Sequence, residues 1–404
     1  MNVIFIEPAF PPNQREFVRG LAEAGATVIG IGERPLEALD GELRNWMLHY
    51  HQVTNVTNAA ELASAVQWVQ GKVWVDRLES SVEAHTMAAA EVRELCSIPG
   101  TSVRTAYLCR DKPSMKEALR QAGVPTAQSS AASTATEVRE FAGVVGYPLI
   151  LKPRAAAGAS GTIRVDSDAE LNQALAGMGA ASIAVEEFVE GHEAFYDTIC
   201  IDGEPAYDFI SHYYPNVLEA MRARWISPQF IATNRADSAP DYGEVRAMGK
   251  RVIEALGIGT SATHMEWFFG PKGLRFSEIG CRPPGVRAWD LYAAGNDIDI
   301  YREWANAIVH GRVMQPLSRR RSAGIVALRP DRDGTITHYD GLEQVQGQLG
   351  DFIIDAHLPG VGTGTQPVDA GYMANAWIRM AHPDFDTLRR MLNAVGETVH
   401  LHAS

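Results

Sequence analysis

The chain has 404 residues, which is enough for two or three domains of ordinary size. Hydrophobic residues make up 46% of it and charged residues 21%, as is typical of a globular protein with a sizeable core. The formal net charge of −13 at pH 7 argues against a nucleic-acid or anionic-membrane surface, because both require clustered Lys and Arg.

We expect no secretory leader at the N-terminus. Its first ten residues, MNVIFIEPAF, carry no basic segment and reach Glu7 and a proline before an apolar stretch can develop. The sequence does not approach the roughly 18 consecutive apolar residues that a membrane-spanning helix requires. The cysteines form no CxxC pair. We therefore expect a cytoplasmic protein with reduced cysteines and no membrane partner.

Alternating strand and helix patterns open the chain. The apolar runs predict a strand at 2–7, a helix at 14–24, a strand at 27–31, a strand at 72–76 and a helix at 81–95. This order is typical of a parallel sheet covered by helices. The first turn reads EPAFPP where a dinucleotide-binding fold would carry GxGxxG, which disfavours an NAD-dependent dehydrogenase. We predict a Rossmann-like N-terminal domain over residues 1–105.

Two lysines stand at the ends of predicted elements in the next segment. Asp111 can cap a helix that begins with Lys112 and Pro113. The strand in YPLILKP ends at Lys152, and a lysine in such a place needs an anionic partner because burying an unpaired charge is costly. The small-residue loop AAAGASG follows at 155–161. Both lysines are therefore candidates for binding an anion.

The central segment mixes strands with longer connections. We expect a connector at 129–136, a helix at 168–178, strands at 182–188, 195–201 and 204–211, a loop at 212–241 and a helix at 242–256. A loop as long as 212–241 inside a compact domain is usually functional or mobile. His212, Arg224 and Trp225 are therefore candidate substrate contacts, and an ordinary solvated loop remains the alternative.

A β-hairpin is predicted where THMEWFFGPKGLRFSEIGCRPPG begins at Thr263. Runs of alternating apolar and polar residues at 263–269 and 273–279 flank a Gly-Pro-Lys-Gly turn, which sets Glu266 opposite Glu278. Facing carboxylates destabilise a sheet unless a positive charge lies between them, and Mg²⁺ is a natural candidate. The alternatives are that an arginine pairs with Glu266 or that the register slips by one residue.

The last segment changes character. Residues 312–404 alternate apolar strands at 323–328 and 351–357 with Gly-rich turns, and a helix and a terminal strand follow. We predict a small C-terminal α+β domain there.

The order of these parts indicates a site for phosphate and metal. Lys112 and Lys152 can neutralise phosphate oxygens. Gly158, Ser160 and Gly161 would let backbone N–H groups approach phosphates without obstruction by Cβ atoms.

In this order of parts the sequence closely resembles the ATP-grasp superfamily, and in particular its carboxylate–amine ligases of the L-amino-acid ligase and biotin-carboxylase-like type. The resemblance covers most of the chain. It implies an α/β protein with the ATP-grasp fold, in which two α+β subdomains clasp ATP. A Rossmann-like βαβ domain would precede that fold, which would span 106–311 with 112–187 as the lid-bearing nucleotide subdomain, and the small domain 312–404 would follow.

The resemblance also assigns roles residue by residue. Lys112 and Lys152 correspond to the two nucleotide lysines, and the loop from Gly158 to Gly161 to the flexible phosphate loop. The residues that correspond to the adenine-reading hinge are Glu186, Glu187, Phe188 and Val189. Glu193 corresponds to the carboxylate that meets the ribose, and Glu266 and Glu278 to the metal carboxylates.

Arg282 corresponds to the arginine that steadies the acyl-phosphate or the substrate carboxylate, and Arg287 is a further candidate substrate contact. Lys152, Glu278 and Arg282 are the expected catalytic residues. Many family members carry Glu-x-Asn where this chain has Glu278 followed by Gly280, which puts a second metal ion in doubt.

The implied activity is that of an ATP-dependent ligase that activates a carboxylate as an acyl-phosphate, releases ADP and joins the acid to an amine. Amino acids or small peptides are the expected substrates, with Mg²⁺, or Mn²⁺ in its place, as the metal. Dimers are common in the family, so a homodimer is a further expectation. Open alternatives are biotin-carboxylase-like carboxylation, a purine-pathway ligase, and a nucleotide-binding subunit with reduced catalysis.

Overall fold

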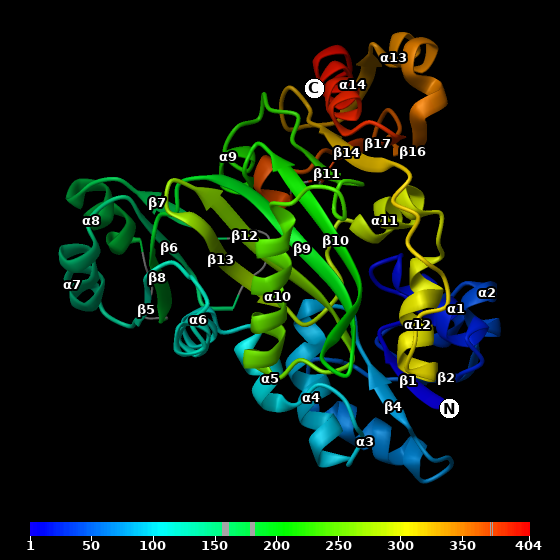
Figure 1. The fold of residues 1–404 in the computed structure, drawn as a ribbon. Helices are drawn as coiled ribbons and strands as arrows, with labels where there is room; N and C mark the ends of the chain where they lie inside the picture. Colours follow the sequence, from blue (N-terminus) through cyan, green and yellow to red (C-terminus); the bar gives the residue numbers. More distant parts are fainter. Residues whose placement is uncertain (156–160, 178–181, 372, 374) are drawn as a thin grey trace.

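The computed structural model describes residues 1–404 except 156–160, 178–181, 372 and 374, and Figure 1 shows how the elements are arranged. The described strands form a parallel four-stranded sheet, an antiparallel four-stranded sheet, an eight-stranded sheet and a two-stranded ribbon. Within these residues, no helix is long and apolar enough to cross a membrane.

The N-terminal part carries the parallel sheet, whose strand order is β3-β2-β1-β4. Its elements are β1 (Asn2–Ile6), α1 (Gln14–Glu23), β2 (Thr27–Gly32), η1 (Leu36–Ala38), α2 (Gly41–Asn45), β3 (Met47–Gln52), α3 (Ala59–Gln70), β4 (Arg77–Glu79), η2 (Glu83–His85), α4 (Thr86–Leu95) and α5 (Val103–Leu108). The predicted βαβ opening is confirmed. The predicted strand at 72–76 is wrong, because the chain joins β1 only from Arg77 onward and leaves Trp74 in solvent.

The antiparallel four-stranded sheet projects from the body of the molecule (Figure 1) and has the order β5-β8-β6-β7. Its elements and the preceding helix are α6 (Lys112–Gln121), β5 (Ser129–Ala132), α7 (Ala135–Val145), β6 (Leu149–Pro153), β7 (Ile163–Val165), α8 (Asp168–Ala176) and β8 (Ile183–Glu187). The predicted connector at 129–136 is wrong. Residues 129–132 pair with β8, and pairing at this edge overrides their weak strand propensity.

The eight-stranded sheet forms the centre of the molecule, with the order β13-β12-β9-β10-β11-β14-β17-β16. Its strands are β9 (His192–Ile201), β10 (Glu204–Tyr214), β11 (Gln229–Ala232), β12 (Ser261–Gly270), β13 (Gly273–Gly280), β14 (Ser322–Leu328), β16 (Ile353–His357) and β17 (Ala376–His382). The predicted loop at 212–241 is wrong, because it contains the end of β10, the helix α9 (Val217–Ala220) and β11. Since β11 pairs with both β10 and β14, the strands after residue 312 continue the same sheet.

Helices and a small ribbon complete the fold. They are α10 (Tyr242–Leu256), α11 (Ala288–Asn296), α12 (Ile300–His310), β15 (Ile336–Asp340), α13 (Leu342–Leu349), η3 (Gly350–Phe352), η4 (Val368–Ala370), α14 (Phe385–Thr398) and β18 (His400–Ala403). The predicted helix at 242–256 is confirmed. Figure 1 shows α12 beside the N-terminal helices and α14 with the ribbon at the opposite end of the molecule.

Helices α1 and α12 join the N-terminal sheet to the central body. The ring of Phe17 on α1 meets Trp304 on α12 edge-on, with 5.1 Å between ring centroids. Gly20 lies one turn further along α1, where a Cβ would stand 2.6 Å from the backbone oxygen of Tyr301. A helix can approach another this closely only through a residue without a side chain. Gly20 therefore sets the distance between the two parts.

This contact generates the first prediction. We expect Gly20→Ala to lower the free energy of unfolding by about 1–3 kcal/mol, because the added methyl group must push α1 away from α12. The thermal unfolding midpoint measures this. Gly41→Ala in α2 is the matched control, since a Cβ there meets no atom within 4 Å. Equal midpoints for the two variants would contradict the close approach of α1 and α12.

Candidate active site

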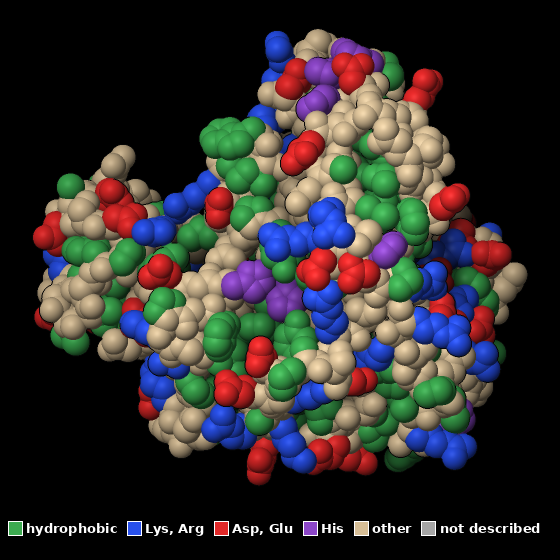
Figure 2. All heavy atoms as spheres, turned by 45° about the horizontal axis from the view of Figure 1, so that its top comes forward, with side chains coloured by type: hydrophobic (Ala, Val, Ile, Leu, Met, Phe, Trp, Pro, Cys, Tyr) green, Lys and Arg blue, Asp and Glu red, His purple; other side chains and the backbone are tan. Residues whose placement is uncertain are grey.

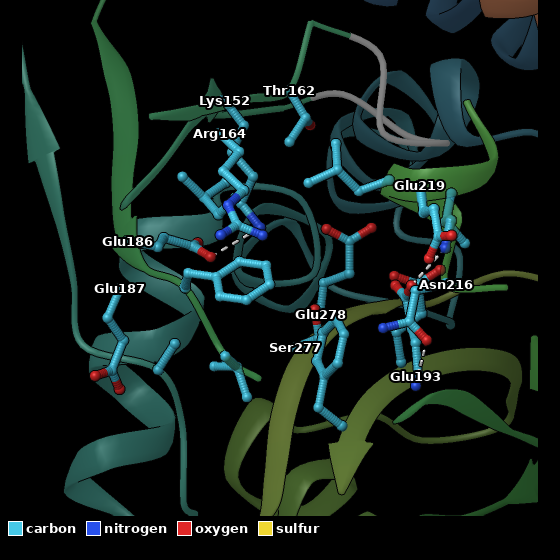
Figure 3. Close-up of a pocket in the computed structure, with 18 of the residues that line it drawn as sticks. Lys152, Thr162, Arg164, Glu186, Glu187, Glu193, Asn216, Glu219, Ser277 and Glu278 are labelled. Carbon is cyan, nitrogen blue, oxygen red and sulfur yellow. Dashed lines mark hydrogen bonds and ion pairs between the residues drawn. The ribbon is translucent and has the colours of Figure 1, made fainter. Parts of the chain in front are cut away.

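A cavity of about 610 Å³ lies between the projecting sheet and the β12–β13 end of the central sheet. Figure 3 shows side chains from both sheets pointing into it. Many charged side chains line its wall, among them Lys112, Lys116, Lys152, Glu186, Glu193, Glu266 and Glu278. The lysines come from α6 and β6, and all the carboxylates except Glu186 come from the central sheet.

The hairpin of β12 and β13 has the predicted register, with Glu266 directly opposite Glu278. A bulge follows at once, so that Trp267 pairs with Phe276. The Nε2 atom of His264 lies 3.6 Å from a Glu266 oxygen. Two carboxylates are thus held at one point of the cavity wall by backbone pairing alone. Register slip, the alternative left open by the sequence, does not occur.

The N-terminus of α6 is anchored on both sides. Asp111 caps the helix by accepting a hydrogen bond from the Ser114 N–H and also binds Arg154 through both carboxylate oxygens, at 2.7 and 3.0 Å. Arg154 comes directly after β6, so one aspartate ties α6 to the end of that strand. This places the Lys112 ammonium 3.3 Å from Glu278. The predicted first lysine therefore faces the predicted metal carboxylate.

Glu186 on β8 lies between two lysines. Its carboxylate is 2.9 Å from Lys152 Nζ and 2.6 Å from Lys116 Nζ, and all three side chains are buried or nearly so. Burial alone would raise the pKa of Glu186, but the two ammonium groups outweigh it and lower that pKa to about 2. For Lys152, burial is likewise outweighed, by Glu186, Glu278 and Glu266, and its pKa is raised. The predicted second lysine is therefore charged and paired with an anion.

Lys116 is a member of the cluster that the sequence analysis missed. It is 1% exposed, and burial lowers its pKa to about 8 despite the attraction of Glu186. Burial lowers the pKa of Lys116, whereas the pKa of Lys152 is raised because Lys152 interacts with both hairpin carboxylates, Glu266 and Glu278. A sequence signal did exist, since residues four apart share a helix face and Lys116 follows Lys112 by four.

Glu193 on β9 is fixed by the segment that precedes α9. Its Oε2 atom accepts a hydrogen bond of 2.7 Å from the Val217 N–H, and its own N–H donates to the Asn216 side chain at 2.9 Å. Figure 3 shows Glu193 and Asn216 together on the side of the cavity away from Glu186. Burial and then the charge of Glu266 raise the pKa of Glu193 to about 8. Glu193 is therefore protonated at pH 7 while only the protein's own charges surround it.

His264 carries a compensating positive charge. Its Nδ1 atom lies 2.7 Å from Asp197, a carboxylate that is 1% exposed. Burial disfavours the imidazolium, but Asp197 and Glu266 outweigh burial and raise the pKa of His264 to about 9. His264 is thus a charged neighbour of Glu266.

The four side chains of the predicted hinge, residues 186–189, make different contacts. Glu186 serves the lysines as described. Glu187 accepts hydrogen bonds from Lys272 at 2.9 Å and from the Gln128 N–H at 3.1 Å, and Figure 3 shows its carboxylate pointing away from the cavity. Phe188 lines the cavity beneath the Arg164 guanidinium, which lies 4.3 Å from the ring centroid. Val189 also lines the cavity.

The predicted phosphate loop is described only in part. Gly158 and Ser160 lie outside the described residues. Gly161 has a φ of +68°, which a residue with a side chain rarely adopts, and a Cβ there would stand 3.0 Å from the ring of Pro153. The prediction that glycine is required at this position is therefore consistent with the backbone.

The three candidate substrate contacts from the predicted loop, His212, Arg224 and Trp225, have different surroundings. His212 lies on β10, where it bonds to His192 at 2.9 Å and to Tyr242 at 2.7 Å. Successive strand residues face opposite sides, and the next residue, Tyr213, directs its hydroxyl toward Glu266 at 3.4 Å. His212 therefore faces away from the cavity, and its predicted substrate contact is not supported by its position. Burial, together with the charges of His192 and Arg389, lowers its pKa to about 3.

Arg224 and Trp225 are neighbours with different partners. Arg224 bonds to Asp333 at 2.8 Å and to the Pro330 carbonyl, which ties this segment to the C-terminal part. Trp225 borders the cavity with 87% of its surface exposed. Of the pair, Trp225 has the position that a substrate or nucleotide contact requires.

The two arginines after the hairpin have different partners. Arg282 Nε donates to Glu83 of the N-terminal part at 2.6 Å. Arg287 has a left-handed backbone, precedes α11 and pairs with Asp290 at 2.6 Å. A Cβ on Gly280 would stand 3.3 Å from the Glu83 carboxylate and 3.4 Å from Arg282. The residue that replaces the family's asparagine therefore leaves room for the Arg282–Glu83 ion pair.

Comparison with known proteins identifies the domain that contains this site. A model of the ATP-grasp domain matches residues 117–294. The chain contains an ATP-grasp domain. Its sequence is 25% identical over 312 residues to an L-arginine-specific L-amino acid ligase of Bacillus subtilis, and this match covers 74% of each protein.

Solved structures agree on the fold. An L-amino acid ligase from Bacillus licheniformis matches with a TM-score of 0.80 and 17% identity, covering 100% of this chain and 98% of that one. The biotin carboxylase domain of the Hydrogenobacter thermophilus 2-oxoglutarate carboxylase, crystallised with MgADP, ADP and bicarbonate, matches with a TM-score of 0.67 and 17% identity over 99% of this chain and 90% of that one. The predicted ATP-grasp fold with a Rossmann-like sheet before it is confirmed.

The ATP-grasp site has donors that fit a hard divalent cation. Glu266 and Glu278 face each other, and their charges contribute to the raised pKa of Glu193. Burial first, and then these like charges, drive Glu193 to retain its proton, which marks a place where positive charge is lacking. Mg²⁺ binds carboxylate oxygens and completes its shell with water and phosphate. These residues therefore suit the ion that the sequence predicts.

The raised pKa of Glu193 predicts how stability depends on pH. Between its ordinary value of 4.5 and about 8, native Glu193 holds a proton that the unfolded chain releases, so stability falls as pH rises through this range. Glu193→Gln removes this loss. We expect the unfolding midpoint of the variant, relative to the wild type, to rise by at least about 2 °C from pH 5 to pH 8 without divalent cations.

Calorimetry in a buffer with a chelator measures this difference. Glu190→Gln, which changes an exposed glutamate three residues earlier, is the control and should show the same pH dependence as the wild type. A difference between Glu193→Gln and wild type that stays constant from pH 5 to pH 8 would show that Glu193 is ionised throughout.

Proposed function

We propose that the protein is an ATP-dependent carboxylate–amine ligase that uses ATP and Mg²⁺, with Mn²⁺ able to replace Mg²⁺. One observation carries the proposal. Inside an ATP-grasp domain, the lysines of α6 and β6 face two opposed carboxylates of the β12–β13 hairpin across a single cavity. That arrangement suits a triphosphate and its metal ion, because the lysines can neutralise phosphate oxygens and the carboxylates can bind the metal ion.

The charged residues divide into two groups with separate tasks. Lys112, Lys116 and Lys152 would neutralise phosphate oxygens, while Glu266 and Glu278 would hold the metal ion. A bound Mg²⁺ supplies charge neutralisation between the anionic carboxylate substrate and the phosphates. Since each of these three lysines is paired with a glutamate, binding of the nucleotide would exchange protein carboxylates for phosphates without leaving a buried ammonium unpaired.

The proposed reaction has two steps. An oxygen of the substrate carboxylate attacks the γ-phosphorus, which forms a C–O–P linkage as the bond to the β-phosphate oxygen breaks and ADP leaves. The amine nitrogen then attacks the acyl carbon, inorganic phosphate leaves with the C–O bond electrons, and the nitrogen loses a proton to give the amide. The protein contributes positioning and charge, as phosphoryl transfer requires.

The substrates are proposed to be small molecules, with an amino acid or small peptide on each side. The similarity to L-amino acid ligases supports this class. Arg282 and Arg287 remain proposed contacts for the acid, and Trp225 for a ligand in the cavity. Domain limits at 1–105, 106–311 and 312–404, a lid formed by 112–187 and a homodimer also remain proposals. The eight-stranded sheet crosses the second limit, so the third part is joined to the second through backbone pairing.

Two substitutions test the site. We expect Lys152→Met and Glu278→Gln each to lower substrate-dependent ADP release by about 100-fold or more, because each removes a charge that faces the transferring phosphoryl group. Lys272→Met is the control, since its ammonium binds Glu187 outside the cavity. Unfolding midpoints establish that the variants are folded. Retained turnover in either site variant would refute the assignment.

A screen of phosphate release identifies the reaction class. Amino acids and small carboxylates are supplied with Mg-ATP, alone and in pairs. We expect release with one carboxylate and one amine, and a hydroxamate when hydroxylamine replaces the amine, because an acyl-phosphate reacts with either nucleophile. Release that depends on bicarbonate and yields no hydroxamate would favour carboxylation. Absence of ATP turnover with intact nucleotide binding would favour a nucleotide-binding subunit.

A further inference from the structure

The ribbon of β15 and β18 carries a cluster of histidine and aspartate side chains. These residues do not line the ATP-grasp cavity. Among the residues that the structure describes, His338, Asp340 and His402 each offer one ligand atom, and these atoms all lie within 4.8 Å of one another. Figure 2 shows histidine and acidic side chains gathered at the upper end of the molecule, where Figure 1 places the C-terminus.

The register of the ribbon brings the three side chains to one face. His338 pairs directly with His402 across the strands, and their rings lie nearly parallel with centroids 4.4 Å apart. Asp340 follows His338 by two residues and so shares its face of the strand. Two imidazoles and a carboxylate thus meet without help from a flexible loop.

Hydrogen bonds fix which nitrogen of His402 is available. Its Nδ1 atom lies 3.2 Å from Asp331, whose other carboxylate oxygen accepts a bond from the Ala403 N–H at 3.0 Å. A carboxylate can only accept, so the Nδ1 atom donates to Asp331, and in the neutral tautomer that carries this proton Nε2 keeps a lone pair. That Nε2 atom is buried, lies 3.2 Å from an Asp340 oxygen and has no hydrogen-bond partner among the described residues.

His338 is oriented in the same way. The Thr337 hydroxyl donates its proton to the His402 carbonyl at 3.1 Å, so it accepts from the His338 Nδ1–H at 3.0 Å. The Nε2 lone pair of His338 is then directed toward the cluster, 3.9 Å from the same Asp340 oxygen. Histidines that bind metals almost always donate their second N–H to a carboxylate or another acceptor in this manner.

We propose that His338, Asp340 and His402 form a binding site for a divalent cation of the Zn²⁺ type, with water in the fourth position. Tetrahedral zinc with bonds of about 2.0–2.1 Å sets its ligand atoms about 3.3 Å apart. The Nε2 atoms of His402 and His338 lie 3.2 and 3.9 Å from one Asp340 oxygen, and these distances bracket that value. Two imidazole nitrogens and one carboxylate select a borderline cation such as Zn²⁺, Co²⁺ or Ni²⁺ over Mg²⁺.

The bound ion would tie the last strand of the chain to β15. Asp331, which orients His402, lies two residues before Asp333, the partner of Arg224, and Arg224 precedes the cavity-lining residue Trp225. Metal binding should therefore raise the thermal unfolding midpoint, because an ion that binds only the folded ribbon stabilises it.

The test uses the full chain without an affinity tag, stripped with chelator and kept in excess Mg²⁺ so that the ATP-grasp carboxylates are occupied. Zn²⁺ is titrated by calorimetry and Co²⁺ by visible absorption. We expect one Zn²⁺ per chain, a higher unfolding midpoint, and a Co²⁺ spectrum of tetrahedral type. His338→Gln and His402→Gln should each weaken binding at least about tenfold, and Asp331→Asn by about 10-fold through the lost orientation of His402.

His357→Gln is the matched control, because it removes an exposed histidine from β16 and should leave binding unchanged. Glu266→Gln should also leave it unchanged, which separates this site from the ATP-grasp cavity. His338 is exposed, so its variant remains informative if the substitution at His402 impairs folding. Absence of saturable Zn²⁺ binding, or equal binding by the wild type and both histidine variants, would overturn the proposal.

Discussion

The pairing of Glu186 with two lysines is the interaction on which the rest of the site depends. One buried carboxylate on β8 receives Lys152 from the adjacent strand and Lys116 from α6. Removing charges from water costs several kcal/mol per ion, so such a group persists only with its partners in place. The pair of contacts therefore fixes α6 against the projecting sheet and also keeps two ammonium groups at the wall of the cavity.

The remaining charges follow from that arrangement. Lys112 reaches Glu278 from the start of α6, and His264 carries its charge toward Glu266. Glu193 is left buried beside carboxylate neighbours, and burial together with the charge of Glu266 raises its pKa. The cations come mainly from the projecting sheet and α6, and the hairpin anions come from the central sheet. A ligand that carries both phosphate and metal is complementary to the two walls at once, which explains why the cavity lies between them.

The sequence determines some of this directly and some of it only through contacts between distant segments. The register that opposes Glu266 to Glu278 follows from alternation and a short turn, which are local. The cap at Asp111 is local as well. Lys116 was missed because its helix face also carries Met115 and Leu119, so a core position explained it equally well. The strand at 229–232 could not be predicted from its own sequence. It forms because these residues pair with β10 on one side and β14 on the other, and β14 lies far away in the chain.

Gly280 shows how the family pattern and this fold are reconciled. The resemblance to the ATP-grasp superfamily implied an asparagine at this position as a further metal contact. Here the space beside its Cα is taken by Arg282 and Glu83, the latter from η2 of the N-terminal part. Because Glu83 also accepts a bond from Arg110 through its carbonyl, just before α6, the same residue contacts both the start of the lysine helix and the end of the hairpin. The N-terminal part thus fills this position with an ion pair that contacts both halves of the site, and Glu266 and Glu278 are the proposed metal ligands.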